Sequence, residues 1–145
     1  MIRPATPGDI ENMAAMGVKL WPEETVESLR TDFSEISGSS KDCVFLSEEN
    51  NQPVGFIHVS VRHDYVEGSS SSPTGYVEAV YVAPDHRQTG VGKALLAEAE
   101  KWCLQKGCIE IGSDTEIENT ISQIFHLGAG FTRSNVLVTF IKKLT

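Results

Sequence analysis

The segment 80–96, VYVAPDHRQTGVGKALL, constrains the fold most, because it joins a strand to a helix through a turn that contains glycine. Its apolar run is rich in β-branched and aromatic residues and stops at Pro84, after which Val91, Leu95 and Ala99 recur at helical spacing. Glycine lets the backbone of such a turn approach a ligand closely. Backbone amides at a helix N-terminus have no intrahelical partner and bind anions. The segment therefore predicts a site for a phosphate-bearing cofactor.

The spacing of the turn excludes two common phosphate-binding loops. It lacks both the Gly-x-x-x-x-Gly-Lys-Ser/Thr pattern of nucleoside triphosphatases and the Gly-x-Gly-x-x-Gly order of dinucleotide-binding proteins. It resembles instead the Arg/Gln-x-x-Gly-x-Gly/Ala signature of the GCN5-related N-acetyltransferases. Arg87, Gly90 and Gly92 stand at the signature positions, after a Val-x-Pro at Val82 and Pro84.

The resemblance implies that the amides of this loop hold the pyrophosphate of acetyl-CoA, which serves as co-substrate. The alternative is an ordinary helix N-terminus whose glycines serve turn geometry alone. The residues that the resemblance assigns to acetyl-CoA from this loop are Arg87, Gln88, Thr89, Gly90, Val91, Gly92 and Lys93.

A second match to the family lies downstream. Members commonly carry an Asn, a helix, a Tyr and then Gly-Phe, and this chain has Asn119, His126 and Gly130-Phe131 at corresponding intervals. The resemblance makes Asn119 a cofactor contact. It places His126 where many relatives have the Tyr proposed as general acid, so the identity of the proton donor stays open.

Composition sets the broad class. A chain of 145 residues with 40% hydrophobic and 22% charged residues is expected to form a single N-acetyltransferase domain over 1–145. No apolar stretch is long enough to cross a membrane, and no basic-then-apolar signal region begins the chain. Three cysteines without metal-ligand spacing predict a reduced, cytoplasmic protein with no metal.

The net charge of −8 and the pI near 4.9 disfavour nucleic acid as a partner. An acid-lined cleft in such a protein would concentrate cationic substrates. Solubility alone is the alternative explanation for the charge. The positions of individual carboxylates must decide between the two.

The chain is expected to form an α/β (α+β) fold of the acetyl-CoA N-acyltransferase type. Its mixed, mostly antiparallel central sheet would be flanked by helices, with central strands that diverge. The Thr6-Pro7-x-Asp9 pattern predicts a helix start. The expected strands cover 2–5, 44–47, 54–61, 75–82 and 109–112, with a closing hairpin over 130–142; the expected helices cover 7–20, 23–36, 91–106 and 118–127.

Glu78 stands in the middle of the apolar strand Tyr76–Val82, where an unpaired carboxylate would be costly. It is either a satisfied ion pair, an outward-facing position, or a base and amine anchor facing the acetyl group. We expect acetyl-CoA between this strand and the Ile109 strand. Backbone N–H groups of Val80, Tyr81 and Val82 would hold the acetyl carbonyl and stabilise the oxyanion.

Several strings resemble one subgroup of the family, the aminoglycoside 6'-N-acetyltransferases. They include Arg62-His-Asp-Tyr65-Val, Ser113-Asp114-Thr115 and Glu118-Asn-Thr-Ile-Ser-Gln123. The resemblance implies an antibiotic pocket lined by Trp21, Glu24, Tyr65, Glu78 and Asp114. Taken alone, Trp21 is equally a core residue, Tyr65 an edge aromatic, and Asp114 a turn or helix cap.

The sequence thus predicts direct acetyl transfer from acetyl-CoA to the 6'-amine of an aminoglycoside, and hence antibiotic resistance. The predicted catalytic residues are Glu78, the main chain at Tyr81, and His126. Relatives often place an acid after Gly-Phe, where this chain offers Asn135 as a substrate contact. Another amine, polyamine or peptide N-terminus, or a non-catalytic binding module, are the alternatives. A homodimer is possible because relatives often dimerise.

Overall fold

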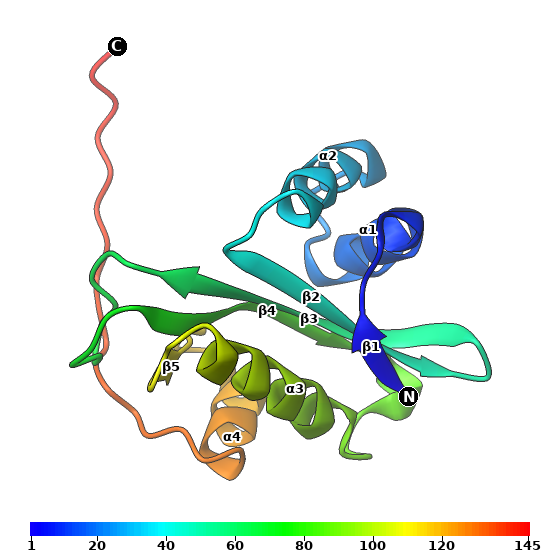
Figure 1. The fold of residues 1–145 in the computed structure, drawn as a ribbon. Helices are drawn as coiled ribbons and strands as arrows, with labels where there is room; N and C mark the ends of the chain where they lie inside the picture. Colours follow the sequence, from blue (N-terminus) through cyan, green and yellow to red (C-terminus); the bar gives the residue numbers. More distant parts are fainter. The chain divides into compact units, whose positions relative to one another are not determined.

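Five strands form one sheet in the computed structural model, which describes all 145 residues (Figure 1). The strands β1 to β5 lie in sequence order across the sheet, the first four antiparallel and β5 parallel to β4. Their bounds are β1 Ile2–Pro4, β2 Asp42–Glu49, β3 Gln52–Arg62, β4 Thr74–Val82 and β5 Ile111–Gly112. The mixed, mostly antiparallel sheet expected from the sequence is confirmed.

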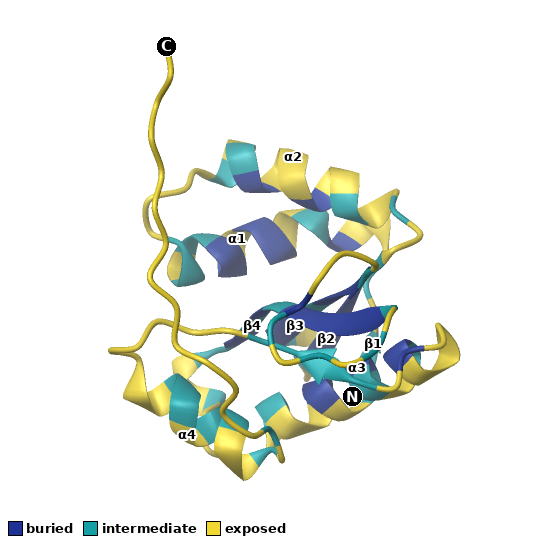
Figure 2. Cartoon of the chain, turned by 90° about the vertical axis from the view of Figure 1, so that its left-hand side faces the viewer, coloured by how far each residue is buried: buried dark blue, intermediate teal, exposed yellow.

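Helices cover both faces of this sheet. Helices α1 (Ile10–Leu20) and α2 (Val26–Ser37) pack on one face, and α3 (Val91–Gln105) lies on the other (Figures 1 and 2). The core beneath α1 and α2 includes Met13, Phe33, Phe56 and Tyr81, and the rings of Phe33 and Phe56 meet edge to face at 5.7 Å. On the other face, β4 packs closely against α3 at Gly75. A Cβ at this position would lie 2.4 Å from Sγ of Cys103 on α3, so only glycine fits there.

Local signals set the element boundaries. The carboxylate of Asp9 accepts hydrogen bonds from the backbone N–H of Thr6 at 2.7 Å and its hydroxyl at 3.0 Å, which starts the 3₁₀ turn Pro7–Asp9 and then α1. Helix α2 begins at Val26 rather than Glu23, because the side chain of Thr25 caps it by accepting from the N–H of Ser28 at 3.0 Å.

Tight turns form two later connections of the chain, the β2–β3 hairpin and the segment after β4. The β2–β3 hairpin turns at Asn50 and Asn51, whose φ angles of 52° and 61° belong to a tight turn that suits paired strands. A second 3₁₀ turn, Pro84–His86, links β4 to the glycine loop. No helix in the structure is long and apolar enough to cross a membrane.

The chain divides into two units, Met1–Ser113 and Asp114–Thr145. The second unit holds α4 (Thr120–Gly128), which Asn119 caps by accepting from the N–H of Ser122 at 3.0 Å. The predicted closing hairpin over 130–142 is wrong, because residues 131–145 contain no strand. Residues 132–145 are exposed throughout, and a lone two-stranded hairpin is marginal in water.

Candidate functional site

Strand β4 has one edge that is paired along its length and one that is mostly open. β3 pairs with it from Thr74 to Val82, whereas β5 pairs only at Gly75 and Tyr76. Beyond Tyr76 the two parallel strands no longer form a ladder. This is the divergence of central strands that the sequence predicts, and it leaves backbone groups of β4 available to a ligand.

The register identifies which amides face the open edge. The N–H of Ala83 donates to the carbonyl of Val54 on β3 at 2.8 Å. Because successive backbone groups of a strand point to opposite edges, the groups of Tyr81 also face β3, and those of Val80 and Val82 face away. The Tyr81 ring is buried against Phe56, at 6.1 Å between centroids. Of the three predicted donors, Val80 and Val82 therefore face the open edge and Tyr81 does not, and their role toward the acetyl group stays a prediction.

The glycine loop after β4 has the backbone of an anion site. Gln88 and Gly90 have φ angles of 62° and 90°, in the left-handed region. The first bond across the helix start runs from Ala94 N–H to Gly90 O at 3.0 Å, so the amides of Val91, Gly92 and Lys93 precede the helical ladder. Consecutive N–H groups of this kind form a concave donor set for phosphate oxygens.

One side chain ties the loop to the strand, and a second ties it to the 3₁₀ turn Pro84–His86. Nε of Arg87 donates to the carbonyl of Val82 at 2.9 Å, and the hydroxyl of Thr89 donates to the carbonyl of His86. The side chain of Arg87 thus satisfies a carbonyl on the open edge of β4. Arg87 therefore holds the glycine loop against the end of β4, a structural role that is separate from any contact with phosphate.

Glu78 occupies a bulge in β4. His58 pairs with Ala79 and Val59 with Val77, so Glu78 has no register partner on β3. A bulge re-aims the side chain of its extra residue. The Glu78 carboxylate is 24% exposed and bonds Arg62 Nη2 through both oxygens, at 2.6 and 2.8 Å. The ion pair that the sequence left open as an alternative is present.

Three other predicted substrate residues belong to the first unit: Trp21, Glu24 and Tyr65. Their hydrogen bonds and core contacts are with residues other than Glu78 and Arg62, and they differ in burial. Trp21 is half-buried at the end of α1 and packs against the core. Glu24 is exposed and accepts from the hydroxyl of Ser28 at 2.8 Å. Tyr65 is 76% exposed, and its hydroxyl donates to Glu67 at 3.1 Å, which raises the pKa of Tyr65.

An open hollow of about 430 Å³ lies beside Arg62 and Tyr65. This volume falls in the range of small-molecule sites. Its lining residues are Lys41, Val61, Arg62, His63, Asp64 and Tyr65. Arg62 therefore belongs both to the ion pair with Glu78 and to the wall of a hollow large enough for a ligand.

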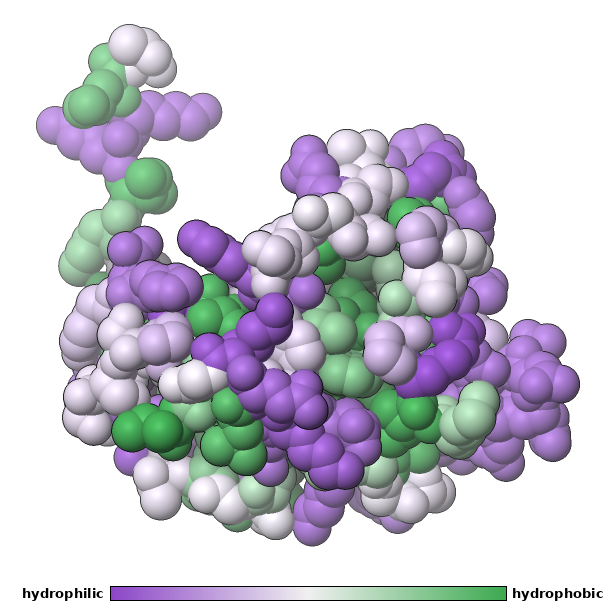
Figure 3. Space-filling view, in the orientation of Figure 1, coloured by the Kyte–Doolittle hydropathy of each residue, from purple (hydrophilic) through white to green (hydrophobic).

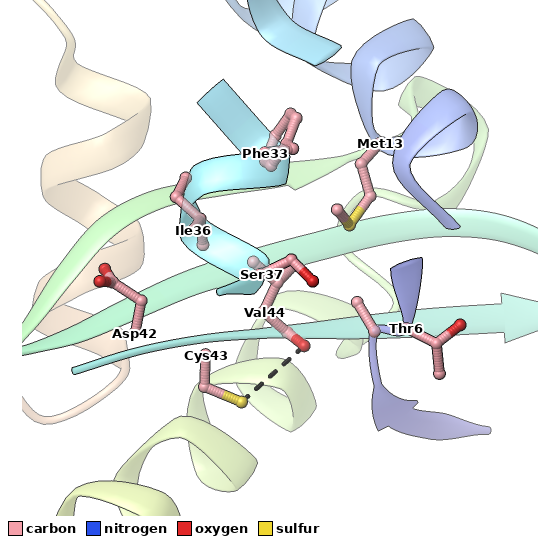
Figure 4. A pocket seen from close by; sticks show the side chains of 9 residues that line it. Thr6, Met13, Phe33, Ile36, Ser37, Asp42, Cys43 and Val44 are labelled. Carbon is pink, nitrogen blue, oxygen red and sulfur yellow. Dashed lines mark hydrogen bonds between the residues drawn. The ribbon is translucent and has the colours of Figure 1, made fainter. Parts of the chain in front are cut away.

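A smaller cavity of about 100 Å³ lies between the first two helices and β2. Figure 4 shows Met13, Phe33 and Ile36 from the helices around it, with Cys43 and Val44 from the strand. It is too small for a drug-sized molecule, and most of its wall belongs to the hydrophobic core. We exclude it as the substrate site.

Four predicted residues belong to the second unit. His126 lies on α4, where Nδ1 is 2.7 Å from the carbonyl of Ser122 and the ring meets Phe131 at 5.1 Å between centroids. Asn119 caps that helix. Asp114 and Asn135 are exposed. For Asn119 the structure displays the capping role, and its role toward a cofactor stays a prediction.

Burial disfavours the thiolate form of all three cysteines. Burial raises the pKa of Cys103 to about 12 and also raises the pKa of Cys43 and Cys108. A raised thiol pKa leaves little thiolate near neutral pH. This chemistry favours direct transfer over a covalent acyl-enzyme.

Three partners were not predicted from the sequence: Ser60 and Arg62 as partners of Glu78, and Glu110 as a partner of the loop with Ser69, Ser70 and Ser71 (the serine loop). Oε1 of Glu110 accepts from the N–H of Ser70 and the hydroxyl of Ser69, each at 3.0 Å, and from the hydroxyl of Ser71. Glu110 thereby fixes the loop between β3 and β4. Alternate residues of a strand point to the same face, so the sequence did indicate that Ser60 and Arg62 lie on one face of β3.

Comparisons with known proteins identify the family of the chain. The family model described as Acetyltransferase (GNAT) family matches residues 10–131. The chain belongs to this family. It is 35% identical over 142 residues, 98% of each chain, to an aminoglycoside N(6')-acetyltransferase type 1 of Salmonella enteritidis. It is 37% identical to one of Stenotrophomonas maltophilia, covering 96% of this chain and 90% of that relative.

A solved structure extends the likeness to three dimensions. It is AAC(6')-Iy in complex with the bisubstrate analogue CoA-S-monomethyl-acetylneamine. Its TM-score is 0.95 at 35% identity, with 99% of this chain and 97% of that chain covered. The acetyltransferase fold expected from the sequence is confirmed.

Replacing Glu110 tests the serine-loop contact. Hydrogen bonds from Ser71, Ser70 and Ser69 lower the pKa of Glu110 below its ordinary 4.5, so the carboxylate stabilises the fold above that pH. We expect Glu110→Gln to be less stable than the wild type at pH 7. The gap should narrow as the pH falls through the lowered pKa, because the wild type then loses the same charge.

Thermal unfolding from pH 7 down to pH 3 measures this gap. Glu35→Gln, an exposed carboxylate on α2, is the control and should show no pH-dependent gap. A Glu110 variant whose deficit stays constant over the whole range would contradict a role for the carboxylate charge.

Proposed function

We propose that this chain transfers the acetyl group of acetyl-CoA to the 6'-amine of aminoglycoside antibiotics and so confers resistance. The observation that carries the proposal is its likeness, over nearly the whole length, to relatives named for that reaction. The open edge of β4 and the glycine loop supply the features that such a reaction needs.

The residues present fit acetyl-CoA. The left-handed backbone at Gln88 and Gly90 and the amides of Val91, Gly92 and Lys93 would bind its pyrophosphate, with Arg87 and Thr89 holding the loop. The amides of Val80 and Val82 would donate to the acetyl carbonyl and the pantetheine arm. When bound, acetyl-CoA supplies an activated acetyl thioester.

Glu78 would orient the acceptor amine and take its proton through water, because an ammonium must become a neutral amine to attack a carbonyl. Trp21, Glu24 and Tyr65 would contribute aromatic and acidic contacts to a polycationic sugar. In the second unit, Asp114 would anchor an ammonium, and Asn135 would add a hydrogen bond. Asn119 is proposed as a cofactor contact, and His126 as the donor of a proton to the leaving thiolate.

An acceptor panel tests the substrate. Release of free CoA is measured with tobramycin, kanamycin, spermidine and a peptide with a free N-terminus. We expect the two aminoglycosides to exceed the others in kcat/KM by about 100-fold, since differences in transition-state binding set specificity. Turnover of spermidine or the peptide at equal efficiency would overturn the aminoglycoside assignment. Drug binding without CoA release would overturn catalysis.

A glycine substitution tests the loop. Gly90→Ala places a side chain on a backbone with φ of 90°, which costs about 1 kcal/mol and distorts the amides before α3. We expect KM for acetyl-CoA to rise about tenfold. Gly107→Ala is the matched control, because Gly107 also has φ of 90° and open space around it.

Steady-state kinetics and thermal unfolding of both variants separate binding from stability. The two should lose similar stability, and only the Gly90 variant should lose affinity for acetyl-CoA. Equal KM values in the two variants would contradict the proposed role of the loop.

We also propose a homodimer. Six large apolar side chains of the segment 132–145 are between 64% and 98% exposed: Val136, Leu137, Val138, Phe140, Ile141 and Leu144. Figure 3 draws this C-terminal segment with hydrophobic and hydrophilic side chains both on the surface. The run 136–141, apolar except for Thr139, is typical of a strand buried on both faces. Exposed apolar stretches of this kind mark interaction sites.

Charge supports a second copy as the occupant. The segment carries Arg133, Lys142 and Lys143 and no acidic side chain, whereas the whole chain has a net charge of −8. A basic segment is attracted to the acidic remainder of another copy. Each copy would also bury the other's apolar side chains, at about 1.5–3 kcal/mol for each one fully buried.

Sedimentation analysis tests the dimer. We expect the wild type to sediment as a dimer at micromolar concentration and Ile141→Asp to sediment as a monomer, because a buried unpaired carboxylate is costly. Thr132→Asp adds the same charge at a polar position of the segment outside the run 136–141 and should retain more dimer. A monomeric wild type, or an Ile141 variant that still dimerises, would overturn the proposal.

We further propose that the two units act as one acetyltransferase domain, since the family match at 10–131 crosses their boundary. A cytoplasmic location is proposed from the three unpaired cysteines, which suit a reducing compartment.

A further inference from the structure

The carboxylate of Glu78 is held by two residues of β3. The hydroxyl of Ser60 and Nε of Arg62 each donate to Oε1 at 3.0 Å, and Nη2 of Arg62 donates to Oε1 at 2.6 Å and to Oε2 at 2.8 Å. Arg62 is itself fixed, because its guanidinium carbon lies 3.6 Å from the centroid of the Tyr76 ring. This arrangement combines a bidentate ion pair with a cation–π contact.

The two carboxylate oxygens are left unequal. A carboxylate offers about four acceptor positions, two on each oxygen. Oε1 receives three donor contacts, whereas Oε2 receives one. A ligand N–H therefore meets Glu78 most readily at Oε2. An ammonium cannot bridge both oxygens while Arg62 occupies them.

We propose that Arg62 is a positioning and specificity-determining residue for acetyl transfer, an inference that rests on the proposed function. Arg62 holds Glu78 so that one position on Oε2 receives the acceptor's amino group or the water that takes its proton. Its fixed positive charge also keeps the carboxylate from trapping a substrate ammonium in a tight, unproductive pair.

The location of Arg62 explains why its hold on Glu78 would affect the amine substrate rather than acetyl-CoA. Arg62 is 41% exposed and lines the hollow of about 430 Å³ that also contains Asp64 and Tyr65. The open edge of β4 begins beyond Tyr76, the residue on which Arg62 stacks. Arg62 thus adjoins the hollow, the carboxylate and the ring at the start of the open edge.

The proposal predicts opposite changes in two kinetic parameters. In Arg62→Gln, both carboxylate oxygens become available to an ammonium, so KM for tobramycin should fall severalfold. The carboxylate also loses its fixed orientation, so kcat should fall about tenfold or more, as misplacement of a positioned group does. KM for acetyl-CoA should stay unchanged.

Three further variants complete the experiment. Arg62→Lys keeps the charge without the two-pronged contact, and should restore KM for tobramycin with only part of kcat. Arg62→Gln in a Glu78→Gln background should change neither parameter further, because the partner is gone. Arg30→Gln is the matched control, since Arg30 makes a similar two-pronged pair with Glu11, at 2.6 and 3.2 Å, between α1 and α2.

Initial rates over a range of tobramycin and acetyl-CoA concentrations, with thermal unfolding of each variant, give the outcome. An active wild type with unchanged kinetics in Arg62→Gln overturns the inference alone. A fall in kcat that is equal with and without Glu78 also overturns it, since it indicates general destabilisation. A wild type inactive toward tobramycin and kanamycin overturns the proposed function, and the inference with it.

Discussion

The unequal pairing of β4 is the constraint on which the rest of the structure depends. β3 pairs with β4 along its whole length, and β5 pairs with it at only two residues. Backbone groups at the centre of a protein need partners, so an open edge between two strands must be filled by a ligand, by water or by side chains. Arg87 already satisfies the carbonyl of Val82. The amides of Val80 and Val82 face the same edge, and we propose that a ligand accepts hydrogen bonds from them.

The sequence predicted those parts of the molecule that depend on neighbouring residues. The strand, the glycine turn and the start of α3 lie within 17 consecutive positions, and each carries its own local signal. The Thr6–Asp9 contact also follows from spacing alone. The start of α2 was misplaced because two acidic residues before Thr25 are good helix formers, whereas the capping bond of Thr25 fixes the boundary.

Other features depend on the register between β3 and β4, which the spacing of residues along the sequence does not reveal. Glu78 attracted attention as a charge within an apolar strand, but Arg62 became its partner only through the bulge that aligns β3 with β4. The same register turns the amide of Tyr81 toward β3 and the amides of Val80 and Val82 toward the open edge. The segment after Phe131 has the composition of a strand, and composition cannot say whether a strand pairs within its own chain.

The negative charge of the chain and the ion pair at Glu78 act over different distances. A net charge of −8 attracts a polycation from afar, but salt screens such attraction beyond about 8 Å at physiological ionic strength. At contact distance the Glu78 carboxylate is paired with the positive charge of Arg62, which in the proposed reaction would limit how tightly a substrate ammonium is held. Binding the ammonium too firmly would stabilise the ground state more than the transition state. In the proposed reaction the overall charge would therefore favour encounter with the substrate, while the ion pair would leave the substrate's amine free to react.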